Sequence, residues 1–442
     1  MPFKFFRAMK TLMAQEQELV GPSVPVIEQD SRPVMIERPE RVAIVHVEDY
    51  DPENVRKGLE RLIELLDLSW MSDLEGKTVL LKPNGLAPMA LACTHPVILD
   101  KVATLVEARG ATVIAGDSNM NKALTTMTHK RVGFTAVAAK HGFPMINFLQ
   151  EGKFVHVSHV SFEMEPVMAI PEAVAEADVV INLPRLKTHG GQVYTGAIKN
   201  FMGLQPNKMH LHAKFTNRPR FQKLLGDMQQ SVLVSPKDGS TKPVLHVLDG
   251  IVGMDGKKGP SSGNAKAYKV LMASTNPAAL DAVGYSIMGG NPKDLVMIQD
   301  LAARNAWPVD IDQLEIVGDD WKTHVQESVL PAVVSKKESG GEVNSFMLNM
   351  TRLVVKIDKK QCKRCLQCVN TCPMGALSKQ GDEIVVDGSK CISCYCCGEI
   401  CPNGALEVVS RAGMLLPRLI TAVVIIVVAI VVLDLLFRFG VL

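Results

Sequence analysis

A repeated run of cysteines near the carboxy-terminal end constrains the fold of this chain most strongly. Of the 10 cysteines in 442 residues, nine lie between Cys362 and Cys401, and the tenth is Cys93. The spacing C-x2-C-x2-C-x3-C-P occurs twice, and the second run begins at Cys391, 391 − 362 = 29 residues after the first. A disulfide framework would spread its bridges through a secreted fold. The clustered cysteines therefore predict metal binding.

The spacing also indicates which metal group is bound. A cubane iron-sulfur cluster takes four soft thiolates, which a tight loop and one further cysteine supply without strain. Where two such runs occur, the fourth cysteine of each run ligates the other cluster. We therefore predict two [4Fe-4S] clusters. The expected ligands are Cys362, Cys365, Cys368 and Cys401 for one cluster, and Cys391, Cys394, Cys397 and Cys372 for the other.

Structural zinc is the alternative, because its tetrahedral sites also use C-x2-C pairs. Two identical four-cysteine runs that both end in Cys-Pro favour clusters. Cys396 is an extra thiol inside the second run, and the spacing selects Cys397 over it as a ligand. Residues 352–410 form the predicted domain, and residues 352–409 resemble a bacterial-type 2[4Fe-4S] ferredoxin. That resemblance implies electron transfer, one electron at a time.

The larger part of the chain, residues 41–334, is predicted to be an α/β domain. Short β-branched runs alternate with helical periodicity, which is typical of a mainly parallel sheet with flanking helices. An alternating pattern at residues 154–170 predicts a hairpin, so a mixed sheet is the alternative. Strands are expected at residues 42–47, 78–82, 112–116, 179–183, 244–248, 269–273 and 314–317, and helices at 52–66, 96–109, 171–177, 194–202, 220–232, 277–288 and 293–305.

The predicted membrane segment lies at the carboxy-terminal end. Residues 419–433 are an uninterrupted run of apolar residues and threonine, long enough for about 22 Å of helix against a hydrocarbon core of about 30 Å. The predicted span is therefore residues 415–438, with a buried core helix as the alternative. Arg411 and Arg418 precede the run and Arg438 follows it, which favours a cell-membrane protein with its bulk on the cytoplasmic side.

Two further segments are expected outside the folded domains. Residues 1–40 combine a basic amphipathic helix with a Pro-rich linker, and no secretory signal peptide is recognised in them. The helix could lie on a membrane surface or be a packing extension. Residues 335–351, rich in Ser, Lys, Glu and Gly, are predicted to be a linker.

Polar residues follow several predicted strands of the α/β domain. Ligands of open parallel sheets bind outside the carboxyl ends of the strands, so these residues predict one cleft. Each of them alone could equally be a helix cap or a solvated lysine. The glycines after Asp249 match neither the dinucleotide fingerprint nor a P-loop. The candidates for an anionic ligand and its chemistry are Lys187, His189 and Asp249 as catalytic groups, and Lys82, Lys199, Asp117 and Asp255 as binding groups.

Two weaker patterns occur in the same domain. His189, His210 and His212 could form a three-imidazole metal site, although histidines in loops rarely do so. The predicted helix at residues 194–202 could receive an anion at its first turn, or its glycines could simply allow close packing.

These stretches also resemble the family known as domain of unknown function 362, over roughly residues 42–320. The resemblance supports the domain boundary and the cleft, implies that a ferredoxin module often accompanies the domain, and implies no particular substrate. The motifs that carry it are Lys-Pro-Asn at 82–84, Thr-His-Pro at 94–96, Gly116-Asp117, Leu-Lys-Thr-His at 186–189, Lys199-Asn200 with Gly203, Asp249-Gly250 with Gly256, Gly259 and Pro260, and Asn276-Pro277 with Asp281.

Composition narrows the classes of function. The formal charge of +2 and a pI of about 8.0 argue against nucleic acid as a partner. The leading prediction is a membrane-anchored iron-sulfur reductase or oxidoreductase subunit that acts on an anionic ligand in the cleft and has an electron donor or acceptor protein as partner. The alternatives are a non-catalytic electron-transfer or docking subunit of a membrane complex, and a carrier or assembly factor for a metal or anionic cofactor.

Overall fold

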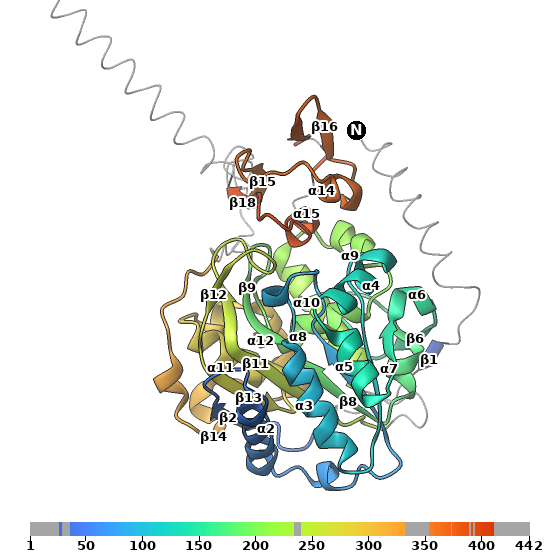
Figure 1. Cartoon of the computed structure of the whole chain (residues 1–442), viewed down its shortest axis with the longest axis vertical. Helices are drawn as coiled ribbons and strands as arrows, with labels where there is room; N and C mark the ends of the chain where they lie inside the picture. Colours follow the sequence, from blue (N-terminus) through green and yellow to red (C-terminus); the bar gives the residue numbers. More distant parts are fainter. Residues whose placement is uncertain are drawn as a thin grey trace, which may run out of the picture.

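The computed structural model describes residues 26–28, 36–233, 240–331, 353–372, 374–388, 390–391 and 394–410. Figure 1 shows an α/β domain with the cysteine-rich module at one end of it. Within the described residues, none of the helices is both long and apolar enough to cross a membrane. The predicted amino-terminal helix, the linker at 335–351 and the membrane segment at 415–438 lie outside the described residues.

A mixed sheet forms the centre of the α/β domain. Its strands follow the order β14-β2-β13-β11-β8-β3-β4-β5, and β13 runs antiparallel to both neighbours while the other neighbouring pairs are parallel. The prediction of a mainly parallel, possibly mixed sheet is thus confirmed. The strands are β2 (Arg41–His46), β3 (Thr78–Pro83), β4 (Thr112–Asp117), β5 (Met145–Asn147), β8 (Val179–Leu183), β11 (Val244–Asp255), β13 (Val270–Ser274) and β14 (Glu315–Gly318).

Shorter strands extend this sheet or lie apart from it. β9 (Arg185–His189) runs parallel to β11 and antiparallel to β10 (Val193–Thr195), and β12 (Asn264–Lys266) also pairs with β11. The hairpin expected at residues 154–170 is present as the antiparallel pair β6 (Phe154–Ser158) and β7 (Met168–Pro171). It belongs to a separate sheet with β1 (Val26–Glu28).

Helices cover both faces of the central sheet, as an α/β domain requires. Alternate residues of one strand therefore enter different cores: Leu80 packs in one, and Val79 and Leu81 pack in the other. The α-helices are α2 (Pro52–Leu66), α3 (Pro96–Glu107), α4 (Lys122–Arg131), α5 (Phe134–His141), α6 (Phe148–Glu151), α7 (Glu172–Glu176), α8 (Ala197–Asn200), α9 (Lys208–Lys214), α10 (Arg218–Leu233), α11 (Pro277–Ile287) and α12 (Val296–Asn305). The 3-10 turns are η1 (Ser69–Ser72), η2 (Ala90–Ala92), η3 (Phe201–Leu204), η4 (Pro292–Asp294), η5 (Ile311–Gln313) and η6 (Trp321–His324).

The predicted helix at residues 194–202 is wrong at its start. Val193–Thr195 form β10 by pairing with β9, and helix α8 begins at Ala197. The buried carboxylate of Asp281 accepts the main-chain N–H groups of Ala197 at 2.6 Å and Ile198 at 2.9 Å. Because these N–H groups have no partner within a helix, a carboxylate from α11 fixes where α8 starts.

The cysteine-rich module contains two small antiparallel sheets and two short helices. β15 (Leu353–Ile357) pairs with β18 (Leu406–Ser410), which brings the two ends of the module together. β16 (Leu377–Gln380) pairs with β17 (Glu383–Val386), between the two cysteine runs. The helices α14 (Gln367–Thr371) and α15 (Cys396–Glu399) each begin inside one cysteine run. This is the small ferredoxin-like domain that the spacing predicts.

Candidate functional site

The two cysteine runs hold their fourth cysteine in the same way. The main-chain N–H of Ala376 donates a hydrogen bond to Sγ of Cys372 at 3.2 Å, and that of Ala405 donates to Sγ of Cys401 at 3.3 Å. Hydrogen bonds to the ligating sulfur atoms are among the factors that set the potential of an iron-sulfur cluster. The sequence repeat is therefore also a repeat of backbone structure.

The arrangement of the thiols is consistent with the two predicted sets. One set lines a cavity of about 360 Å³ and comprises Cys362, Cys365, Cys368 and Cys401. In the other set, burial and then the neighbouring thiols raise the pKa of Cys397 well above its usual value; those neighbours include Cys394, Cys372 and Cys391, and also Cys368 of the first set. As predicted for the first set, Cys401 of the opposite run lines the cavity together with the other three cysteines. Four soft sulfur donors around each position fit two [4Fe-4S] clusters.

A second cavity, with an empty volume of about 490 Å³, lies at the carboxyl ends of strands in the α/β domain. Asn84 follows β3 and Asp117 ends β4, while the charged groups of the lining that remain come from β9, α8, α9 and α15. Its polar lining includes Asn84, Asp117, Lys187, Lys199, Lys208 and Glu399. The cavity thus lies where the topology of an open α/β sheet predicts a ligand site.

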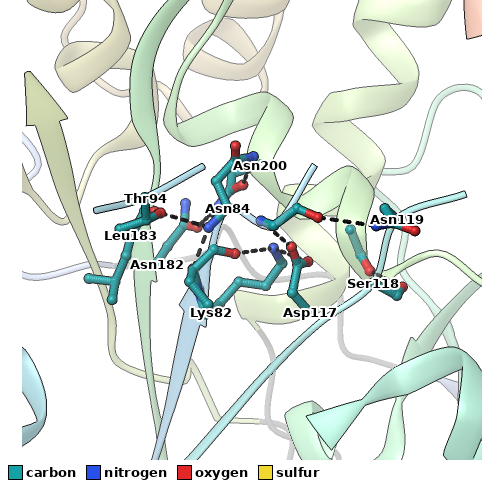
Figure 2. A network of polar contacts seen from close by, with 12 residues as sticks. Lys82, Asn84, Thr94, Asp117, Ser118, Asn119, Asn182, Leu183 and Asn200 are labelled. Carbon is teal, nitrogen blue, oxygen red and sulfur yellow. Dashed lines mark hydrogen bonds and ion pairs between the residues drawn. The ribbon is translucent and has the colours of Figure 1, made fainter. Parts of the chain in front are cut away.

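Lys82 and Asp117 form a buried ion pair beside this cavity (Figure 2). Nζ of Lys82 donates to Oδ1 of Asp117 at 2.6 Å, and the other carboxylate oxygen accepts the N–H of Gly85 at 2.6 Å. Burial lowers the pKa of Lys82, an effect that Asp117 opposes. Because each charge is matched by the other, this pair fixes the turn after β3 and adds no net charge to the cavity.

Amide side chains continue the network from this pair (Figure 2). Nδ2 of Asn84 donates to Oδ1 of Asn200 at 2.7 Å, and Nδ2 of Asn200 donates to Oδ1 of Asn182 at 2.7 Å. Because Asn182 lies in β8 and Asn200 in α8, these bonds hold α8 over the sheet. The orientation of Asn84 also leaves its own oxygen facing a lysine from β9.

Two buried lysines of the cavity have neutral partners. Nζ of Lys187 donates to Oδ1 of Asn84 at 2.6 Å and to a main-chain carbonyl at 2.5 Å. Nζ of Lys208 donates to Oγ of Ser118 at 2.7 Å and to another carbonyl at 2.6 Å. Burial lowers the pKa of each lysine to about 7. Among the described residues neither ammonium forms an ion pair, so the cavity holds positive charge that an anion would balance.

Glu399 of the cysteine-rich module reaches this same cavity. The residue is 4% exposed, and it lies on α15 two positions after the predicted ligand Cys397. Its Oε1 is 2.7 Å from Nε2 of His189, 3.8 Å from Nζ of Lys199 and 3.9 Å from Nε2 of His212. Burial by itself would raise the pKa of Glu399, but Lys199 and the hydrogen bond from His189 outweigh that effect and lower it. A carboxylate from one domain therefore meets three basic groups of the other.

The hydrogen bonds of His189 define its tautomer. Nδ1 accepts the N–H groups of Gly191 and Gln192, both at 3.0 Å, so the proton resides on Nε2 and is donated to Glu399. Burial, assisted by Lys199, lowers the pKa of His189 to about 3. Both ring nitrogens are thus engaged by the protein. His189 is neutral and positions Glu399, an arrangement that differs from the three-imidazole metal site considered from the sequence.

His212 has the opposite tautomer. Its Nδ1 lies 2.7 Å from the carbonyl oxygen of Lys208 and donates to it, which leaves Nε2 as the basic nitrogen at the cavity. Burial lowers the pKa of His212, against the influence of Glu399. The ring is therefore a neutral proton acceptor on the side of the cavity that faces α15.

The sheet places the two remaining candidates apart from the cavity. Asp249 accepts a hydrogen bond from the hydroxyl of Tyr50 at 2.7 Å and lies 3.6 Å from Nη1 of Arg185. Asp255 accepts hydrogen bonds from Nδ2 of Asn264 at 3.2 Å and from a main-chain N–H at 3.0 Å. Neither aspartate lines the cavity, whereas Asp117, Lys187 and Lys199 do.

The structure adds groups that sequence reasoning did not select. Lys208 follows the Gln-Pro-Asn sequence after η3. The sequence pattern that could have indicated it is its place two residues before the alternating histidines His210 and His212. Glu399 corresponds to Asn370 in the first cysteine run, because the 29-residue offset aligns them. The sequence pattern that could have indicated Glu399 is an acidic residue at only one of these two equivalent positions.

Two sets of four thiols in a ferredoxin-like module define an iron-sulfur protein that binds two [4Fe-4S] clusters. Comparison with protein families identifies both domains: residues 79–286 match the domain of unknown function (DUF362), and residues 354–402 match the 4Fe-4S dicluster domain. The chain is therefore a protein with a DUF362 domain followed by a C-terminal 4Fe-4S dicluster domain, as both resemblances in the sequence indicate.

Similar proteins include one curated relative. It is named thylakoid-associated protein sll1697, from Synechocystis sp., and it is 28% identical over 297 residues, which are 64% of this chain and 87% of the relative. A solved Thermotoga maritima protein is 13% identical with a TM-score of 0.34, over 51% of this chain and 56% of that one. The lactate racemase apoprotein from Thermoanaerobacterium thermosaccharolyticum is 13% identical with a TM-score of 0.35, over 57% and 59%. This chain thus spans less than two thirds of either solved structure.

Proposed function

We propose that this protein is a membrane-anchored iron-sulfur reductase that delivers electrons to a small anionic ligand in the cavity of its DUF362 domain. The observation that carries the proposal is the position of Glu399. Its helix also provides the ligand Cys397, and its carboxylate lines the cavity beside Lys199. The cluster-binding segment and the cavity are therefore in direct contact.

The charges of the cavity indicate the class of ligand. The ion pair of Lys82 with Asp117 is neutral overall, and Lys199 is balanced by Glu399. Lys187 and Lys208 contribute positive charge without a carboxylate partner among the described residues. A buried charge without a counterion is costly, so an anion that contacts both ammonium groups is favoured. A small carboxylate or oxyanion is the class of anion that these two ammonium groups would bind in the cavity.

The same residues can move protons. A lysine whose pKa is about 7 exchanges its proton readily at neutral pH, which suits Lys187 and Lys208 to donate a proton to a reduced ligand. Lys199 stays paired with Glu399, and His189 holds that carboxylate in place. His212 offers an unprotonated Nε2 that can accept a proton. The two [4Fe-4S] clusters would supply single electrons.

Membrane attachment is the second part of the proposal. The apolar run at residues 419–433 supports it, and a curated relative is named as thylakoid-associated. Deleting residues 415–442 should move the protein from the membrane fraction to the soluble fraction. Continued sedimentation with membranes would assign attachment to another segment or to a partner protein.

Binding and turnover test the reductase proposal. Anaerobically purified protein should contain about eight irons, and inorganic phosphate and oxalate serve as probe anions in calorimetry. Lys187→Met and Lys208→Met should each weaken binding about tenfold or more, because each removes a charged partner of the anion. Lys293→Met, on the exposed surface, is the matched control. Probe affinities equal to the control for both cavity variants would contradict an anion site.

A non-catalytic electron-transfer subunit is the second candidate, and the buried contact of Glu399 favours it. Three basic groups around one carboxylate would suffice to dock the two domains without any ligand. In that case Lys187→Met and Lys208→Met would leave electron transfer through the intact complex unchanged. Loss of electron delivery in these variants, with normal iron content, would instead support the reductase.

A further inference from the structure

The two cysteine runs share a backbone structure but meet different surroundings. Leu366 and Tyr395 are equivalent in the repeat, and both precede a helix with positive φ, 63° and 68°. Leu366 is half-buried at the surface, whereas Tyr395 is 1% exposed and lies against Gly190, where a Cβ would come within 2.9 Å of the tyrosine ring. The absence of a side chain at Gly190 thus makes room for the second run.

Other contacts fix the second run against the DUF362 domain as well. Oγ of Ser261 donates to the carbonyl of Gly398 at 3.2 Å, and Oγ of Ser262 donates to that of Cys401 at 3.0 Å. Figure 1 shows α15 next to the DUF362 domain, with α14 farther from it. The position equivalent to buried Glu399 in the first run is Asn370, which is exposed. The second run therefore faces the cavity, whereas residues 363–365 of the first run are exposed and the α/β domain contacts that segment through Lys258, which donates to Gln361 at 2.8 Å.

Charge follows the same division. Residues 358–368 around the first run contain four basic residues and one acidic residue, a net charge of +3, whereas the equivalent residues 387–397 contain one of each. Lys360, Lys363 and Arg364 are exposed, and among the described residues no carboxylate forms an ion pair with them. Cys365 is exposed between them and belongs to the cavity lined by the first thiol set.

We infer that the surface formed by Lys360, Lys363, Arg364 and Cys365 docks a small electron-carrier protein that has an acidic face around its redox group. In this encounter one electron leaves the reduced carrier, which is oxidised, and enters this protein, which is reduced, and no bond is made or broken. Only the direction of electron transfer, from the carrier to this protein, rests on the proposed reductase function. Complementary charge raises the rate of encounter, and an exposed ligand loop gives the carrier a short path.

Stopped-flow reduction of the full-length, cluster-loaded protein tests the docking surface. The donor is a reduced acidic [2Fe-2S] ferredoxin, and visible absorbance reports the reaction. The triple variant K360Q/K363Q/R364Q should be reduced about tenfold more slowly at low salt, and its rate should depend less on salt. Reduction by a small photoreduced deazaflavin should be unchanged, and so should the iron content. The matched control K57Q/K153Q/K293Q removes three exposed lysines of the α/β domain.

The results of these experiments distinguish a wrong docking inference from a wrong reductase proposal. Equal rates for the triple variant, its control and the unchanged protein would overturn the inference. Loss of binding to anionic phosphatidylglycerol vesicles, with unchanged reduction by the carrier, would overturn it too and identify the surface as a lipid contact. Reduction by the carrier precedes any chemistry in the cavity. A failure of the reductase proposal would therefore appear in anion binding, and a failure of the docking inference in the rate of reduction.

Discussion

Removing the carboxylate of Glu399 should loosen the contact between the two domains. In Glu399→Ala, His189 loses a hydrogen-bond acceptor at 2.7 Å, and the ammonium of Lys199 is left buried without its counter-charge. Breaking a buried pair by removing one partner costs about 3–5 kcal/mol. Since about 1.4 kcal/mol is a factor of ten in an equilibrium, the open population should rise by between about 10² and 10⁴. Glu399→Gln keeps an acceptor for His189 and should lose less.

Amide hydrogen exchange measures this opening in the cluster-loaded protein. Peptides from the β9–β10 hairpin and from α15 should exchange faster in Glu399→Ala, while the buried strands β3 and β8 should keep their protection. Asn370→Ala is the matched control, because it alters the equivalent, exposed position of the first run and should change stability by less than about 0.5 kcal/mol. If the two variants exchanged alike, with equal iron content, Glu399 would not hold the domains together.

Three further outcomes are expected. Affinity for the probe anion should fall as the pH rises through about 7, because burial lowers the pKa of Lys187 to that value and the deprotonated amine attracts no anion. Calorimetry across this pH range measures the affinity, and an affinity independent of pH would contradict the prediction. Gly190→Ala should open the domain contact in hydrogen exchange, since its Cβ would meet the ring of Tyr395 at 2.9 Å, whereas Gly388→Ala, with nothing within 4 Å, should not. Cys396→Ser should keep about eight irons by metal analysis, because the repeat leaves this thiol outside both ligand sets, and loss of four would make it a ligand.

Local patterns predicted the framework of the α/β domain well. Pro52–Leu66 and Val179–Leu183 have the expected bounds, because a capped amphipathic helix and a short β-branched run are determined by nearby residues. β11 is longer than the predicted strand at residues 244–248, because the glycines that follow Asp249 are typical of a loop. The strand continues to Asp255 because Gly250 and Gly253 let neighbouring backbones approach: a Cβ would meet a carbonyl oxygen at 3.0 Å and 2.6 Å.

The cavity could be predicted only in part, for a physical reason. Lys187 and Lys199 stand out because they follow a strand or begin a helix at the expected edge of the sheet. Asp249 shares that edge, but its partners Tyr50 and Arg185 hold it elsewhere, and side-chain pairing between distant segments has no local pattern. The role of Glu399 could not be predicted for the same reason, since it depends on how the two domains pack against each other.

The shortness of α15 has a consequence for assembly of the mature protein. Its four residues carry both a cluster ligand, Cys397, and the carboxylate that meets the cavity, Glu399. Because Cys397 and Glu399 are only two residues apart on one short helix, binding of iron and sulfide should also fix the position of the Glu399 carboxylate, since metal binding and local folding are linked. Freshly synthesised chains would then acquire a finished cavity only on maturation.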